Sequence, residues 1–189
     1  MIKLTKLLFL LSLVIFLGSC DNDDDDSTGS AADLIGTWIA TSFEYETSSS
    51  TSGSGIPDSE VMTEANGSNL NYELTFTQSN YTTSGSYDMT ITATQDGNVV
   101  ADTTQSYTNV TGAGTYSVMG DQITVGGSFF DFDVDGIDLS AFTIGDQTAT
   151  YKITSDDKLE VTQDAEISST VQGITSTSTI RSKSVWERQ

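Results

Sequence analysis

Short segments in which apolar and polar residues alternate follow one another from residue 33 to the end of the chain, and this repetition constrains the fold most. In residues 72–76, for example, Tyr72, Leu74 and Phe76 alternate with polar residues. Such alternation is typical of a strand with one buried face. Thr, Val, Ile and Tyr, which favour strands, are frequent, and Pro occurs once. We therefore predict an all-β domain.

Turn signals between these segments predict that neighbouring strands pair in antiparallel order. Residues 95–98 read Gln-Asp-Gly-Asn, a strong hairpin signal between expected strands at 86–95 and 98–110. Residues 115–125 and 150–161 resemble each other, since each places apolar residues on both sides of a short polar turn. We predict an antiparallel meander of about eight to ten strands. Closure into a β-barrel would remove its unpaired edges.

Three regions have no clear alternation. Residues 47–59 are rich in Ser and Gly and are expected to form a flexible loop. Residues 60–70 are ambiguous between a short helical turn and another loop. The stretch 166–189 is rich in Ser and Thr and is expected to hold one or two strands.

The first twenty residues have the pattern of a secretory signal peptide. Lys3 and Lys6 precede an apolar stretch at 7–17, and small residues then lead to Cys20, the single cysteine of the chain. The ending Leu-Gly-Ser-Cys resembles the cleavage box of bacterial lipoproteins. The resemblance implies a signal peptide at 1–19 and a mature N-terminus at Cys20. It also implies a thioether-linked diacylglycerol and an acylated amine such as palmitate on Cys20, which would anchor the chain in a lipid bilayer.

An acidic run follows the cysteine. Residues 21–26 read Asp-Asn-Asp-Asp-Asp-Asp, and small polar residues come next. Like charges of this density predict a disordered tether over residues 20–32. The run resembles an export signal for surface-exposed lipoproteins in some Gram-negative groups. In other groups, aspartate after the cysteine resembles an inner-membrane retention signal. Because the run is long, we favour the outer membrane with the domain exposed at the cell surface.

Directly after the tether, Gly36-Thr37-Trp38 matches the G-x-W motif of lipocalins and lipocalin-like bacterial lipoproteins. The resemblance implies an up-and-down β-barrel over residues 33–189. In that family the tryptophan plugs the closed end of the barrel, and a basic side chain from a late strand packs over it. Arg181 is our first candidate for that side chain and Arg188 the second. A large aromatic residue on a strand is usually core, so we expect Trp38 to be structural rather than ligand-binding.

Charge and composition exclude several functions. The chain has 7 Lys and Arg against 27 Asp and Glu, for a net charge of −20. Such a surface repels phosphate backbones, so we predict no nucleic-acid partner. There is no histidine, which excludes Ser-His-Asp and Cys-His catalysis and any zinc site built on histidine.

One constellation suggests a metal. Asp131, Asp133, Asp135 and Gly136 form Asp-x-Asp-x-Asp-Gly, the opening of many calcium loops, and Asp138 follows. The position that should hold a closing glutamate is phenylalanine, so the motif is incomplete. A Ca²⁺ cofactor would have to be bound by these four aspartates in another geometry.

The same residues also read as a hairpin. With a turn at 135–136, one face is entirely apolar, while the other places Asp133 opposite Asp138. Directly opposed aspartates repel each other, and a bound cation would relieve that repulsion. The two interpretations are compatible. We favour the plain solvated hairpin and keep the Ca²⁺ site as the alternative.

These features favour a non-catalytic ligand-binding or interaction module held at the cell envelope. A small apolar molecule, a glycan or a protein are the partners that we consider. An alternative is a structural or adhesive surface protein that binds Ca²⁺ through the acidic hairpin. An enzyme acting on glycans is a weaker hypothesis. Glu44 and Glu46 share one face of a strand, but nothing marks them as a catalytic pair.

Overall fold

Eight strands and one short helix make up the domain in a computed structural model, which describes residues 30–53, 55–130 and 146–189. Their order along the chain is α1 (Ala31–Leu34), β1 (Gly36–Gly53), β2 (Ser59–Phe76), β3 (Asn80–Gln95), β4 (Asn98–Met119), β5 (Gln122–Gly126), β6 (Asp146–Ile153), β7 (Lys158–Val171) and β8 (Ile174–Arg188). Within these ranges, no helix has the length and apolar character needed to cross a membrane.

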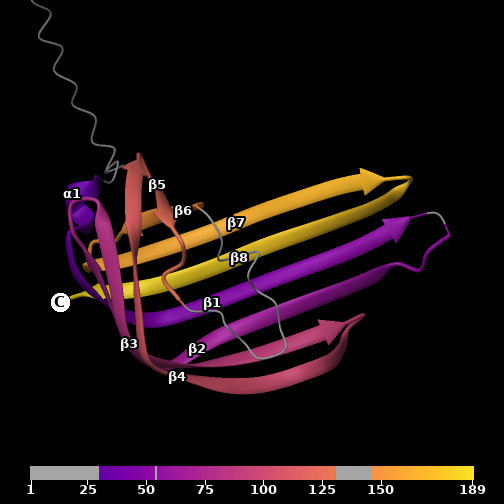
Figure 1. The fold of residues 1–189 in the computed structure, drawn as a ribbon, viewed down its shortest axis with the longest axis horizontal. Helices are drawn as coiled ribbons and strands as arrows, with labels where there is room; N and C mark the ends of the chain where they lie inside the picture. Colours follow the sequence, from indigo (N-terminus) through magenta and orange to yellow (C-terminus); the bar gives the residue numbers. More distant parts are fainter. Residues whose placement is uncertain (1–29, 54, 131–145) are drawn as a thin grey trace, which may run out of the picture.

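Each strand pairs antiparallel with the next, and β8 returns to pair with β1, which closes the barrel (Figure 1). The predicted all-β meander and its closure into a barrel are therefore confirmed. The expected turn at 95–98 also joins two strands. Asp96 and Gly97 have φ angles of 49° and 77° there, the left-handed backbone that two-residue hairpin turns require.

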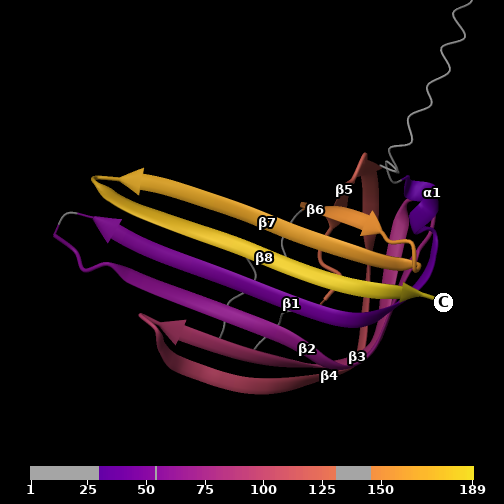
Figure 2. The same ribbon diagram turned by 180° about the vertical axis from the view of Figure 1, so that it is seen from behind.

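Among the described residues, all eight strands pair around the barrel only at the end that holds α1. β5 and β6 are short, and they pair with β4 and β7 only at residues 116–119 and 159–162. The other six strands continue past them as a curved sheet in the order β7-β8-β1-β2-β3-β4. Figures 1 and 2 show these long strands extending away from the end that holds α1.

Two expectations about irregular segments were wrong. Residues 47–53 continue β1 instead of starting a flexible loop, and residues 60–70 lie inside β2. Thr47 has strand neighbours on both sides, Thr63 in β2 and Ile180 in β8. The backbone hydrogen bonds of a central strand outweigh the weak strand preference of a Ser- and Gly-rich segment.

Aromatic side chains fill the barrel. Trp38 and Trp186 are fully buried, and so are Met89, Ile91 and Leu159. Around them lie the other buried aromatic residues, Phe43, Tyr45, Tyr72, Phe76, Tyr81, Tyr87, Tyr107, Tyr116, Phe129, Phe130 and Tyr151. The exposed faces of the strands carry mainly Thr, Ser and charged residues, the alternation expected for strands with one buried face.

Candidate functional site

The tryptophan of the Gly-x-Trp motif closes the α1 end of the barrel. Trp38 is fully buried, and its indole Nε1 donates a hydrogen bond of 2.8 Å to the carbonyl oxygen of Leu34. The guanidinium carbon of Arg188 lies 4.2 Å from the centroid of the Trp38 ring. The same guanidinium donates hydrogen bonds to the carbonyl oxygens of Asp33, at 2.6 Å, and Ile35, at 3.2 Å. Arg188 therefore joins the last strand to α1 and to β1.

The first choice for this basic residue, Arg181, is wrong. In the pairing of β1 with β8, Trp38 lies opposite Arg188, whereas Arg181 lies opposite Glu46. Arg181, on β8, therefore lies opposite a position of β1 that is eight residues beyond Trp38, too far away to contact the tryptophan. Gly36 opens β1 with a φ of 134°, and a Cβ there would lie 3.3 Å from Nη1 of Arg188. Glycine therefore leaves space for the arginine.

Several predicted site residues lie outside the described ranges. These are the lipidation candidate Cys20 and the four aspartates proposed for Ca²⁺, Asp131, Asp133, Asp135 and Asp138. In the ranges that are described, no cluster of three or more His, Cys, Asp or Glu residues is arranged to hold a metal ion.

Around Phe129 and Phe130, the described residues of the barrel interior pack closely. The ring of Phe130, just after β5, packs at centroid distances of 4.1 Å from Phe43 and 5.3 Å from Trp186. The neighbouring Phe129 accepts a hydrogen bond of 2.9 Å from the Tyr72 hydroxyl through its carbonyl oxygen. The cavity beside these rings has a volume of about 70 Å³. Cavities that enclose small-molecule ligands measure roughly 300–1,000 Å³, so the described interior is a packed core.

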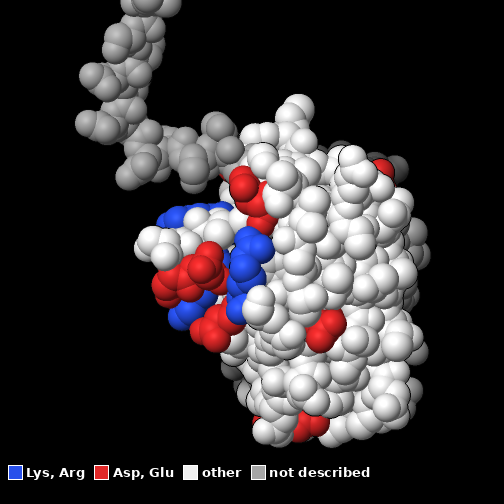
Figure 3. All heavy atoms as spheres, turned by 90° about the vertical axis from the view of Figure 1, so that its left-hand side faces the viewer, with Lys and Arg blue, Asp and Glu red and all other residues white. Residues whose placement is uncertain are grey.

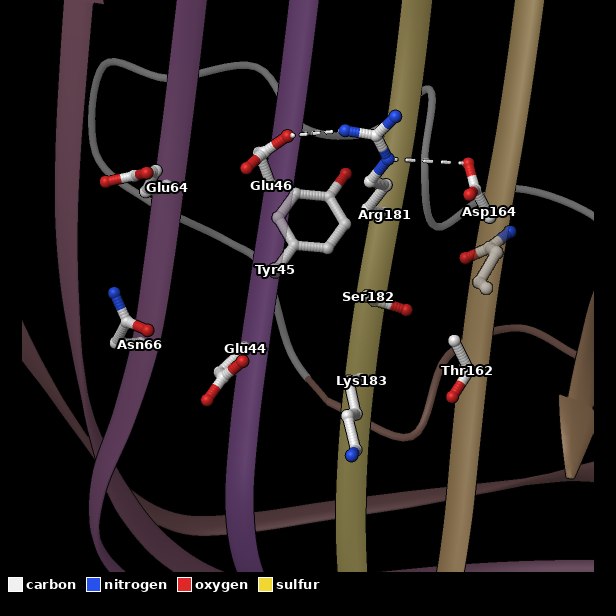
Figure 4. A pocket seen from close by; sticks show the side chains of 11 residues that line it. Glu44, Tyr45, Glu46, Glu64, Asn66, Thr162, Asp164, Arg181, Ser182 and Lys183 are labelled. Carbon is white, nitrogen blue, oxygen red and sulfur yellow. Dashed lines mark hydrogen bonds and ion pairs between the residues drawn. The ribbon is translucent and has the colours of Figure 1, made fainter. Parts of the chain in front are cut away.

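A larger hollow of about 320 Å³ lies on the outer face of the sheet. Tyr45 and Ala65 are buried on the inner face, so their neighbours along each strand point outward. We call this hollow the outer groove. Its outward-facing residues are Glu44, Glu46, Glu64, Asn66, Thr162, Asp164, Arg181 and Lys183 (Figure 4).

Strand register explains how these residues meet. One row across β2, β1, β8 and β7 consists of Glu64, Glu46, Arg181 and Asp164. The adjacent row consists of Asn66, Glu44, Lys183 and Thr162. Each row therefore combines side chains from β1 and β2, early in the sequence, with side chains from β7 and β8, at its end.

Ion pairs in the outer groove neutralise only part of its negative charge. Arg181 lies between two carboxylates, 3.4 Å from Glu46 and 3.6 Å from Asp164, as Figure 4 shows. Lys183 lies 3.6 Å from Glu160. Glu44 and Glu64 form no ion pair with any residue that the structure describes. The outer groove thus has more carboxylates than cations.

Glu64 stands directly opposite Glu46 in the pairing of β1 with β2. Like charges in directly opposed positions of a sheet destabilise it. Arg181 offsets this repulsion only on the Glu46 side, because its other contact is with Asp164. A cation that binds beside Glu64 would offset the remainder. The arrangement is therefore suited to binding positively charged groups.

Figure 3 shows how charged residues are distributed over the face of the molecule at the α1 end. Lys and Arg gather there in one strip, interleaved with Asp and Glu, while most of the visible face is uncharged.

Sequence reasoning singled out Glu44, Glu46 and Arg181 but missed Glu64, Asp164 and Lys183. No local signal marks those three, since only strand register brings them together.

Comparisons with known proteins matched no family model, no curated protein and no solved structure. The fold and the geometry of the outer groove are therefore the basis for the functional proposal.

Proposed function

We propose that this chain is a lipocalin-like lipoprotein of the cell envelope and that its barrel is a non-catalytic interaction module. Lipid on Cys20 holds it at the outer membrane, with the domain exposed at the cell surface. The outer groove binds the partner. The observation that carries the proposal is the contrast between the cavity of about 70 Å³ beside Phe129 and Phe130 in the described interior and the outer groove of about 320 Å³.

The N-terminal sequence supports the anchoring. Signal peptide, cleavage box and single cysteine coincide within residues 1–20. The first described element, α1, lies at the closed end of the barrel, and the long hairpins extend in the opposite direction (Figure 2). A chain anchored at Cys20 therefore enters the domain at the end opposite those hairpins. This arrangement suits a module that presents its sheet to partners outside the membrane.

The chemistry of the outer groove favours a partner that bears amine or guanidinium groups. Of the four carboxylates that line the groove, Glu44 and Glu64 have no ion pair with a described residue, whereas Glu46 and Asp164 are paired with Arg181. Charge complementarity steers encounter and sets specificity at such surfaces. A basic segment of a protein satisfies this requirement, and we take it as the partner class. The groove has no histidine to act as a base, which supports binding without turnover.

Anchoring is tested in cells by metabolic labelling with an alkyne analogue of palmitate. The wild-type chain should incorporate the label and fractionate with outer membranes, whereas Cys20→Ser should lose both properties. Protease added to intact cells should then digest the domain. An unlabelled wild-type chain would refute lipidation, and a labelled chain that resists protease only in intact cells would refute surface exposure.

Binding is tested with a short fluorescent arginine-rich peptide and the full chain carrying Cys20→Ser. The double variant Glu44→Gln/Glu64→Gln should weaken saturable binding by about fivefold or more, because it removes the unpaired carboxylates. A matched control, Asp58→Asn/Glu73→Gln, removes the same charge outside the groove lining. Equal affinities of the two double variants would show that the peptide senses only overall charge, and would refute the groove as the site.

A further inference from the structure

The edge of β7 beyond β6 has the geometry of a pairing surface. β6 ends its pairing with β7 at Thr162, and in the described part of the chain residues 164–171 pair with no strand other than β8. Residues 166–171 are all exposed, with Ile167 and Val171 each 67% exposed. Figures 1 and 2 show β7 at the margin of the sheet, beyond the short strands β5 and β6. A long exposed edge is a template for another strand.

The hairpin that joins β7 to β8 reveals which backbone groups face this edge. Its loop has two residues, Gln172 and Gly173, with φ angles of 53° and 79°. In such a hairpin the flanking residues Val171 and Ile174 exchange both backbone hydrogen bonds. Hydrogen-bonded pairs then recur at every second position. Asp164, Glu166, Ser168 and Thr170 therefore direct their N–H and C=O groups away from β8, toward the edge.

These residues are complementary to a second copy of the same strand. In an antiparallel pair centred on Ile167, Glu166 faces Ser168 of the other copy and Asp164 faces its Thr170. All four edge residues then pair through outward-directed backbone groups, and no carboxylate directly opposes another. The two Ile167 side chains meet at the centre, where a pair without hydrogen bonds brings side chains closest. A register centred on residue 165 would instead oppose Asp164 to Glu166.

We propose that this protein self-associates through β7, which pairs antiparallel with β7 of a second copy in the register centred on Ile167. The two sheets become continuous across a two-fold axis, so the contact is closed and produces dimers. The chain has a net charge of −20, so added salt strengthens the association by screening repulsion. This inference does not rest on the lipid anchor or on the outer groove.

The other free edge, that of β4, is less suited to the same contact. Its register with β3 shifts between Gly85 and Tyr87 and again between Ala93 and Thr94. Such irregularities twist an edge and disturb further pairing. The register of β7 with β8, by contrast, runs without a shift from Lys158 to Val171. A regular edge favours a regular partner strand.

Cysteine cross-linking tests the register. The full chain carrying Cys20→Ser has no other thiol, so one introduced cysteine reports one position. Under mild oxidation Ile167→Cys should form dimers at least about tenfold faster than Ser169→Cys, because opposed residues without hydrogen bonds suit disulfide geometry. Two copies of residue 169 would lie about 14 Å apart along the strand. Ala165→Cys mixed with Ser169→Cys should cross-link again, because these positions face each other.

Sedimentation of the same chain without an introduced thiol gives a second readout. Its average mass should rise toward twice the monomer with protein concentration and salt, and Ile167→Lys should remain monomeric with an unchanged circular-dichroism spectrum. Equal cross-linking of Ile167→Cys and Ser169→Cys would overturn the register. A wild-type chain that stays monomeric at high concentration and salt would overturn the self-association.

Discussion

The guanidinium carbon of Arg188 lies over Trp38, 4.2 Å from the ring centroid, and this contact connects the last strand to the first. The two residues are direct neighbours in the pairing of β1 with β8. Two further hydrogen bonds from the same guanidinium reach Asp33 in α1 and Ile35 just after it. One side chain therefore connects three elements at the closed end of the barrel.

Replacing Arg188 should destabilise the domain more than replacing the other candidate arginine. Arg188→Ala removes a cation–π contact and two hydrogen bonds, so we expect a loss of about 2 kcal/mol. Arg181→Ala removes only exposed ion pairs and should cost about 0.5 kcal/mol or less. Urea unfolding of both variants measures the difference. Equal losses would contradict the role assigned to Arg188.

Truncating Phe130 should open the interior. Its ring contacts those of Phe43, Tyr72, Tyr87 and Trp186, so Phe130→Ala should lower the free energy of unfolding by about 3–5 kcal/mol. The variant should also bind an apolar fluorescent probe that the wild-type chain does not bind. Phe130→Leu, which keeps most of the volume, is the control. Probe binding by the wild-type chain would show that its interior is already open.

Alanine substitutions at two glycines distinguish the cost of steric crowding from the cost of a positive φ angle. A Cβ on Gly85, whose φ is 137°, would overlap the backbone oxygen of Asn71 across the β2–β3 pair. Gly97 has a φ of 77° with nothing near the added atom. We expect Gly97→Ala to cost about 1 kcal/mol. Gly85→Ala should cost about 3 kcal/mol, because overpacking adds to the strain. Thermal unfolding compares them, and similar losses would contradict the crowding at Gly85.

Alkaline pH should unfold the domain as buried phenols ionise. Burial raises the pKa of Tyr45, Tyr81, Tyr116 and Tyr151 above their ordinary value. The unfolded chain loses these protons first, near pH 10, so the contribution to stability is complete below that pH and falls as the pH rises further. Phenolate absorbance and circular dichroism should therefore change together. Early ionisation of all tyrosines with the fold intact would contradict this.

Local patterns were sufficient for parts of the fold. The turn at 95–98 needs a left-handed backbone that Asp-Gly provides, and the alternation around Tyr72, Leu74 and Phe76 matches their burial in β2. Local patterns failed at residues 47–53 and 60–70. There the Ser- and Gly-rich composition has little preference of its own, and pairing with neighbouring strands decides the conformation.

The sequence by itself determined that the chain forms an antiparallel all-β meander, because side-chain alternation and turn residues act over a few neighbouring positions. It also singled out Gly36 and Trp38. Only the tertiary structure decided between Arg181 and Arg188, since both lie on β8 and strand register alone sets which one faces Trp38. Tertiary structure also decided the packed interior and the outer groove, because both bring together side chains from strands that are far apart in the sequence.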